Sequence, residues 1–250
     1  MLTVVIPVQE LRPRFLGAVS STLQSIQTVL CDISHEVLVI MSIQTKLSND
    51  FFSRYPTLKV LQEEHSSHSG ALNTGLKHAQ YEHILVLNPG DRLICDPEFF
   101  RSLFPLISSV IYSFNVVSDS KFIGNVHSKN GSCTLSNYVK IRGKKHFLDL
   151  PHQGLILPKT LDTKLHEYSC SFDLRMDYNY LANFLASRTP SWIYFYSCLL
   201  SYYPLGGKSM LISNRRKFYL EQLRVDFRLG LNFFPAVLRY IYWVIRSSLF

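Results

Sequence analysis

The sequence predicts an α/β domain built on a mostly parallel sheet with helices on both faces. Two observations carry this prediction: short apolar runs rich in β-branched residues recur along the first third of the chain, and stretches with apolar residues at three- and four-residue steps lie between them. Continuous apolar strands that alternate with helices are typical of a parallel sheet buried on both faces.

The first elements follow from these patterns. Strands are expected at four apolar runs: Leu2–Pro7, Glu36–Ile40, Leu58–Leu61 and His83–Leu87. The first two strands are separated by a predicted helix whose apolar positions share one face: Leu16, Val19, Leu23, Ile26 and Leu30. A second helix is expected from about Ser69 to Ala79. A third begins at Asp96-Pro97-Glu98, where a capping side chain precedes a proline.

The second half of the chain, from about Val110, mixes strand-like runs with loops. Strands are expected at Val110–Phe114, Gly154–Leu157 and Trp192–Tyr203, and a helix near Asp177–Ser187. These elements extend the same domain.

Composition and charge favour a globular domain with a basic tail and disfavour a nucleic-acid-binding protein. The chain has 250 residues, 47% of them apolar, which suits one globular domain with an appendage. The net charge is +8, but Gly207–Phe250 holds eight basic residues and two acidic ones, so the remainder is close to neutral. A near-neutral body with a basic, aromatic tail favours an anionic membrane surface or phosphate over nucleic acid. Five widely spaced cysteines without a C-x-x-C pair indicate reduced thiols in a cytosolic compartment.

Ligands of such sheets sit beyond the carboxyl ends of the strands. Three strands end in informative sequences: Pro7-Val8-Gln9-Glu10, EEHSSHSGALNTG and Asn88-Pro89-Gly90-Asp91. A G-x-G-x-x-G turn after the first strand and a G-x-x-x-x-G-K-[ST] loop anywhere are both absent from the sequence, which excludes the common dinucleotide and P-loop sites.

Five segments in chain order resemble the landmarks of family 2 glycosyltransferases, most closely the bacterial exopolysaccharide and O-antigen branch. They are TVVIPV, ALNTGLKHAQYEHILVLNPGD, PHQGLILPK, FDLRMDYNYL and LGGKS. The resemblance implies the type A nucleotide-sugar fold, a Rossmann-like mixed sheet, and inversion at the anomeric centre. It also implies a glycosyltransferase domain over residues 1–210, with a nucleotide-sugar half (1–109) and an acceptor half (110–210), followed by a basic helical segment (211–250).

Two carboxylates take catalytic roles from the resemblance. Asn88–Asp91 occupies the place of the family's acidic metal-binding motif, so Asp91 would hold Mg²⁺ or Mn²⁺ against the donor diphosphate, a hard oxygen ligand for a hard cation. The alternative is a plain β-turn, whose composition it also fits. Asp177 sits where the family has its general base, and the alternative there is a helix N-cap.

The resemblance assigns the other candidate residues to ligand contacts. Donor-binding positions are Pro7, Val8, Glu10, Asn73, Asn88 and Gly90; for Asn73 a structural role is the alternative. Positions near the acceptor and the donor loop are His152, Gln153, Gly206, Gly207 and Lys208. A zinc site at Glu64–His68 is disfavoured, because the H-E-x-x-H order and a third strong ligand are missing.

Three departures from the family pattern bear on the donor's identity and on activity, and one of them is that the metal motif keeps the single acid Asp91. Met41–Lys46 replaces an aspartate- and serine-rich turn that holds the nucleotide base, and His65 stands in place of an aspartate. The expected function is transfer of a sugar from a nucleotide diphosphate to a saccharide or lipid-linked acceptor, in surface polysaccharide synthesis. The alternative is a non-catalytic relative that binds a saccharide or a partner transferase.

The C-terminal tail has the pattern of an interfacial helix. From Glu221 onward, polar residues fall at four- and seven-residue steps among aromatic and aliphatic ones: Arg224, Arg228, Asn232, Arg239 and Arg246. Such a stripe beside a wide apolar face favours an anionic membrane surface, with Pro235 expected to kink or split the helix. The alternative is packing on the chain's own domain or in a homodimer. We expect a cytoplasmic protein, peripheral on the inner face of the plasma membrane, because no apolar run is long enough to span a bilayer and the N-terminus matches a strand rather than a signal peptide.

Overall fold

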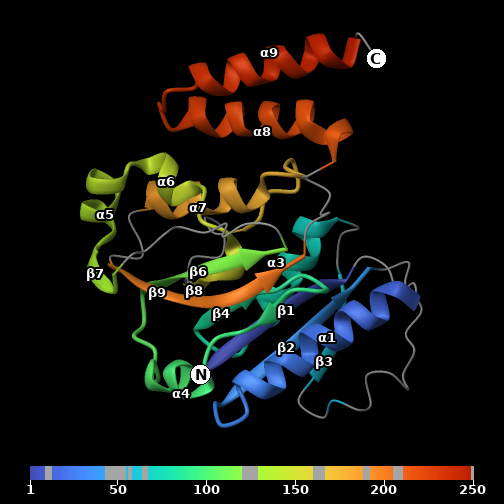
Figure 1. Ribbon diagram of the computed structural model, residues 1–250, viewed down its shortest axis with the longest axis vertical. Coiled ribbons are helices and arrows are strands. Elements are labelled where there is room, and N and C mark those ends of the chain that lie inside the picture. Colours follow the sequence, from blue (N-terminus) through green and yellow to red (C-terminus); the bar gives the residue numbers. More distant parts are fainter. Residues whose placement is uncertain are drawn as a thin grey trace.

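The computed structural model describes residues 1–8, 13–42, 55, 58–63, 67–119, 129–159, 167–187, 192–204 and 211–248. Its centre is one mixed sheet with helices on both faces (Figure 1). The strands are β1 (Leu2–Val8), β2 (His35–Met41), β3 (Leu58–Gln62), β4 (His83–Val86), β5 (Arg92–Leu93), β6 (Val110–Ser118), β7 (Gly131–Thr134), β8 (Leu155–Pro158) and β9 (Trp192–Tyr203).

Eight α-helices and two short 3-10 helices complete the described part of the chain. The α-helices are α1 (Pro13–Val29), α3 (His68–His78), α4 (Pro97–Ser102), α5 (Leu135–Arg142), α6 (Lys144–Leu148), α7 (Met176–Ser187), α8 (Arg215–Arg228) and α9 (Phe234–Ser248). The 3-10 helices are η1 (His152–Gly154) and η3 (Ile212–Asn214).

The sheet joins the two halves of the sequence. Its strand order is β3-β2-β1-β4-β8-β6-β9-β5, with β7 added to β9. The strands β3, β2, β1 and β4 are parallel, β8 runs antiparallel to both β4 and β6, and β6 and β9 are parallel. The predicted mixed, mostly parallel sheet is confirmed, and β8 is the strand that brings the second half against the first.

Both faces of the sheet are buried, as the continuous apolar strands predict. On one face Val4 and Ile6 of β1 belong to the same core cluster as Leu23 of α1, and on the other Val5 shares a cluster with Leu72 of α3 and with α7. Each fully buried aliphatic side chain contributes about 1.5–3 kcal/mol. A strand buried on both sides has apolar residues on both faces, which explains why β1 does not alternate; its buried Thr3 hydroxyl donates to the Glu36 carboxylate at 2.7 Å.

The predicted elements lie close to the observed ones. The expected first strand, Leu2–Pro7, is one residue shorter than β1. The helix start at Asp96 is confirmed, since its Oδ1 accepts a hydrogen bond from the Phe99 N–H at 2.8 Å and Pro97 opens α4.

The C-terminal segment is a helical hairpin, and the prediction of one helical stripe from Glu221 onward is wrong. Helix α8 already begins at Arg215, and Asn232 lies in the connection to α9, where Gly230 adopts a positive φ of 63°. Pro235 is the second residue of α9, so the expected split is confirmed. Figure 1 shows α8 beside α9, with α9 on the outside of the molecule. Within the described residues, no helix combines the length and apolar character needed to cross a membrane.

Candidate active site

The turn after β4 forms one side of the candidate site. The Asp91 N–H donates to the Asn88 carbonyl at 3.0 Å, which is the hydrogen bond of a β-turn, and the Asp91 Oδ2 accepts from the Asn88 N–H at 2.7 Å. Gly90 has φ +99°, and a Cβ there would meet Pro204 at 3.2 Å. The β-turn interpretation of this segment is therefore correct as geometry, and it leaves the Asp91 carboxylate fixed at the carboxyl edge of the parallel strands.

Asp91 is a buried carboxylate, 3% exposed. Burial raises its pKa to about 6, against the opposing effects of the Asn88 N–H, His152 and Gln153. Among the described residues, no lysine or arginine forms an ion pair with it. Within the described part of the chain the carboxylate thus has no full positive countercharge, a setting that a bound cation would suit.

The 3-10 helix η1 brings His152 and Gln153 against this turn. The His152 Nε2 lies 3.1 Å from the Asn88 Nδ2, and the Gln153 carbonyl accepts from the Ser201 hydroxyl at 2.8 Å. Gly154 permits this close approach, because a Cβ there would lie 2.7 Å from the Phe114 carbonyl oxygen. A bulkier residue would push η1 away from the sheet.

Asp177, on the first turn of α7, faces His152 from the other side. Its Oδ2 lies 3.6 Å from the His152 Nδ1, and its Oδ1 accepts from the Tyr178 N–H at 2.8 Å. Burial opposes ionisation of this carboxyl, but His152, Arg175 and the Tyr178 N–H together hold its pKa below the usual value. Asp177 is the second residue of α7 rather than the residue before it, yet it still satisfies one first-turn N–H.

The four side chains form a row, Asp91–Asn88–His152–Asp177. The Asn88 Nδ2 can only donate, and in the tautomer whose Nε2 accepts this hydrogen bond the His152 ring carries its N–H on Nδ1, toward Asp177. The structure therefore brings the expected metal turn, acceptor motif and base together. It leaves Asp177 with a side chain 31% exposed, which a substrate hydroxyl could reach.

Other predicted residues lie elsewhere. The Asn73 side chain donates to the Tyr168 carbonyl at 2.8 Å and accepts from the Tyr168 N–H at 2.7 Å, so its amide ties α3 to the segment before α7. Pro7 and Val8 end β1 inside the protein, with Val8 only 1% exposed. Glu10, Gly206, Gly207 and Lys208 lie outside the described residues, as does His65.

One residue near the site escaped the sequence prediction. Burial and the charge of Asp91 raise the pKa of Tyr203, at the end of β9. Its signal in the sequence was its place at the end of an aromatic strand, directly before the glycine-rich loop that resembles the donor loop.

Comparison with known proteins identifies the fold. No protein-family model and no curated sequence matches the chain. Among solved structures it is similar to S. aureus TarS 1-349 in complex with UDP, with a TM-score of 0.63 and 15% identity over 100% of this chain and 72% of that one. The TarS 1-349 complex with UDP-GlcNAc gives 0.64 and 16% over 100% and 73%. TarS is a glycosyltransferase with a type A-like fold.

This chain has a glycosyltransferase fold of type A. Its membership of family 2 stays a prediction from the sequence landmarks.

Within this fold, Asp91 is the residue that would hold a divalent cation. No group of three or more histidine, cysteine, aspartate or glutamate side chains in the described part of the chain could enclose a metal ion. A single carboxylate fits Mg²⁺ or Mn²⁺ when phosphates and water supply the other ligands, and Asp91, a buried carboxylate without a lysine or arginine partner among the described residues, fits such an ion. The metal itself stays a prediction.

Proposed function

We propose that this chain is a glycosyltransferase that moves a sugar from a nucleotide-diphosphate donor to a saccharide or lipid-linked saccharide acceptor, with inversion, in surface polysaccharide synthesis. One observation supports it most: Asp91 and Asp177 lie at one edge of a type A glycosyltransferase fold, joined through Asn88 and His152. The two carboxylates have opposite electrostatic settings: burial raises the pKa of Asp91, whereas His152, Arg175 and the Tyr178 N–H lower that of Asp177.

Asp177 would act as the general base. Because its pKa lies below the usual value, the carboxylate is ionised at neutral pH and can accept a proton. The acceptor oxygen bonds to the anomeric carbon as its proton passes to Asp177, and the bond from that carbon to the diphosphate oxygen breaks. Inversion follows when the attack comes from the side opposite the diphosphate. His152 would be a positioning residue, since its Nδ1–H faces the Asp177 Oδ2.

The leaving diphosphate needs positive charge. When bound, Mg²⁺ or Mn²⁺ at Asp91 would neutralise the charge that develops on the diphosphate. Asn88 and Gly90 would hold the Asp91 turn in place, through the Asn88 N–H and the bond from the Gly90 N–H to the Thr22 hydroxyl.

The test is a thermal-shift screen of nucleoside diphosphates with and without Mn²⁺. A ligand at one hundred times its Kd should stabilise the native state by about 2.7 kcal/mol, so we expect one nucleotide with Mn²⁺ to raise the melting temperature. Asp91→Ala should abolish the Mn²⁺-dependent shift. The matched control is Asp32→Ala, which removes an aspartate whose side chain is 60% exposed and pairs with Arg101 at the surface.

Two outcomes would revise the proposal. If Asp91→Ala binds nucleotide and Mn²⁺ as well as the parent does, the metal turn is wrongly assigned. If every nucleoside diphosphate leaves the melting temperature unchanged, the second candidate function stands: a non-catalytic relative that binds a saccharide or a partner transferase. The observation that favours it is the replacement of the family's base-binding turn by Met41–Lys46, of which Met41 and Ser42 are buried.

A further inference from the structure

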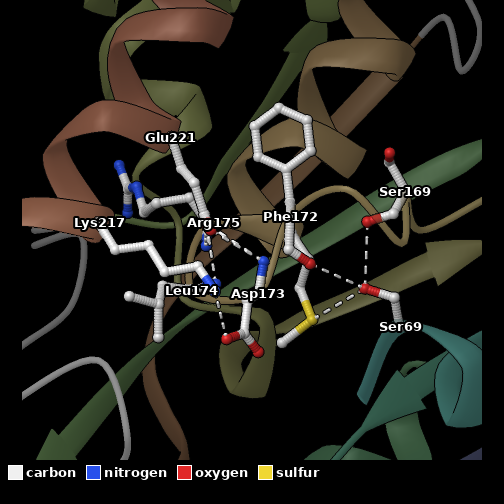
Figure 2. Close-up of polar contacts among 9 residues, drawn as sticks. Ser69, Ser169, Phe172, Asp173, Leu174, Arg175, Lys217 and Glu221 are labelled. Atoms are coloured by element: carbon white, nitrogen blue, oxygen red, sulfur yellow. Dashed lines mark hydrogen bonds and ion pairs between the residues drawn. The ribbon is translucent and has the colours of Figure 1, made fainter. Parts of the chain in front are cut away.

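The exposed charged side chains of the α8–α9 hairpin are all positive. Residues 211–248 contain seven basic side chains and two acidic ones, Glu221 and Asp226. Both acids are buried, at 2% and 0% exposure. The Tyr178 hydroxyl donates to Asp226 at 2.5 Å, and Glu221 accepts from the N–H groups of three consecutive residues, Asp173–Arg175 (Figure 2). The outward charges of the hairpin are therefore all positive.

The basic side chains are spread along both helices. On α8, Lys217, Arg224 and Arg228 recur at seven- and four-residue steps along one flank and are exposed, although Lys217 pairs with Asp173 and Arg228 donates to the Asn183 side chain at 3.3 Å. On α9, Arg239 and Arg246 are seven residues apart and exposed. Positive charge thus accompanies the hairpin over its length, while the first 206 residues carry only +2.

The outer face of α9 is apolar. Its exposed residues fall at three- and four-residue steps with exposures of 46–62%: Phe234, Leu238, Ile241, Tyr242 and Ile245. The opposite side packs inward, with Ala236 1% exposed. The arginines of α9 lie on one flank of this apolar face, where the Arg246 Nη1 donates to the Tyr242 hydroxyl at 3.2 Å.

The positive charge of the hairpin distinguishes between two possible partners of the apolar α9 face, a second copy of the chain and a lipid bilayer. In a twofold dimer the same patch meets itself, so two hairpins would bring like charges together. A bilayer with anionic headgroups is complementary to both features, because the acyl region accepts the aromatic and aliphatic side chains and the phosphates accept the arginines.

We propose that the α8–α9 hairpin docks the protein on an anionic bilayer surface, with the exposed face of α9 at the boundary between headgroups and acyl chains. In the hairpin, α9 is outermost and α8 lies between α9 and the body of the protein (Figure 1). Docking through α9 would therefore leave the body, which holds the candidate active site, on the far side of α8 from the bilayer. This inference stands apart from the proposed catalysis, because it uses residues of the hairpin alone.

The test is co-sedimentation of the full chain with phosphatidylcholine vesicles, with and without phosphatidylglycerol, at low and high salt. We expect binding to the anionic vesicles that weakens with salt, since mobile ions screen exposed charges. Ile241→Glu should weaken binding by roughly tenfold or more, because it removes one exposed aliphatic side chain that would enter the acyl region and adds a negative charge. Arg239→Gln and Arg246→Gln should each weaken it roughly fivefold.

The matched control is Ile141→Glu on α5, where an isoleucine outside the hairpin is 75% exposed; it should bind as the parent does. Ile241 is exposed, so the melting temperature should stay unchanged, and Leu238→Ser serves as a second variant if Ile241→Glu unfolds. Asp177→Asn should bind vesicles normally. The proposal is overturned if the parent does not bind anionic vesicles at low salt, or if Ile241→Glu binds them as well as Ile141→Glu does. It is also overturned if the parent binds no vesicles and sedimentation velocity shows that it forms a dimer that Ile241→Glu dissociates.

Discussion

The Asp177 carboxylate accepts the Tyr178 N–H at the start of α7 and is also the proposed general base. One substitution distinguishes the structural role from the catalytic one. Asp177→Asn keeps a side-chain oxygen for the Tyr178 N–H but cannot accept a proton at neutral pH. We expect turnover to fall by roughly 10² to 10⁴, while the melting temperature and donor affinity stay close to the parental values. Sugar-transfer rates and nucleotide titrations of the two proteins provide the measurement.

The control for this substitution is Asp173→Asn, which makes the same chemical change four positions earlier, at an aspartate paired with Lys217. It should transfer sugar at the parental rate. If Asp177→Asn also transfers sugar at that rate, Asp177 serves only the helix terminus, and His152 becomes the next candidate for the proton acceptor.

Single residues of the site could be predicted from the sequence, but their contacts could not. Asp91, His152 and Asp177 each followed from a motif with its own local pattern. Asn88 and His152 are 64 residues apart, and they meet only because β8 enters the sheet beside β4. Strand order depends on long-range pairing, which the apolar pattern of each strand does not specify. Asn73 fitted both a donor contact and a structural role, and its bonds to Tyr168 are tertiary.

At the scale of elements, a side chain of α8 holds the segment that precedes α7. The Glu221 carboxylate accepts from the backbone of Asp173, Leu174 and Arg175, the residues that lead into the helix carrying Asp177 (Figure 2). The Glu221 carboxylate is only 2% exposed, and hydrogen bonds to a carboxylate are stronger than bonds between neutral groups.

We therefore expect Glu221→Ala to lower the free energy of unfolding by roughly 2 to 4 kcal/mol, because three backbone donors lose their buried acceptor. Urea denaturation measures the loss. The matched control, Lys217→Met, removes the neighbouring surface ion pair with Asp173 and should cost less than about 1 kcal/mol. Equal losses in the two variants would mean that the buried carboxylate has no special role in holding α7.

The elements of the sheet were easier to predict than the helices of the tail. A strand buried on both faces shows itself as a continuous apolar run. In the tail, the four- and seven-residue spacing continues through Arg228 and Asn232 to Arg239, although residues 229–233 are not helical. Periodicity alone therefore concealed the break, which Gly230 permits through its positive φ.

At the scale of the whole molecule, helix α8 lies between the body that holds the candidate active site and the helix α9 that forms the proposed membrane surface. Helix α8 faces the body with Glu221 and Asp226 and carries α9 on another side. Helix α8 thus connects the candidate active site to the proposed membrane surface. Its buried acidic side chains hold it against the body, and its exposed basic side chains add to the positive charge of the hairpin. A protein built in this way should lose one function without losing the other.

Truncation after Asn232 tests this separation. The cut removes α9 but keeps Leu229 and Leu231, which pack against the core, and it keeps the anchors of α8. We expect the shortened chain to retain the nucleotide-dependent thermal shift and to lose most binding to anionic vesicles, because the apolar face and two of the arginines are gone. Full-length Ile241→Glu is the comparison, and it should lose vesicle binding to a similar extent. Undiminished vesicle binding by the shortened chain would assign the docking to the basic side of α8 alone. A lost thermal shift would instead make α9 a structural part of the nucleotide-binding body.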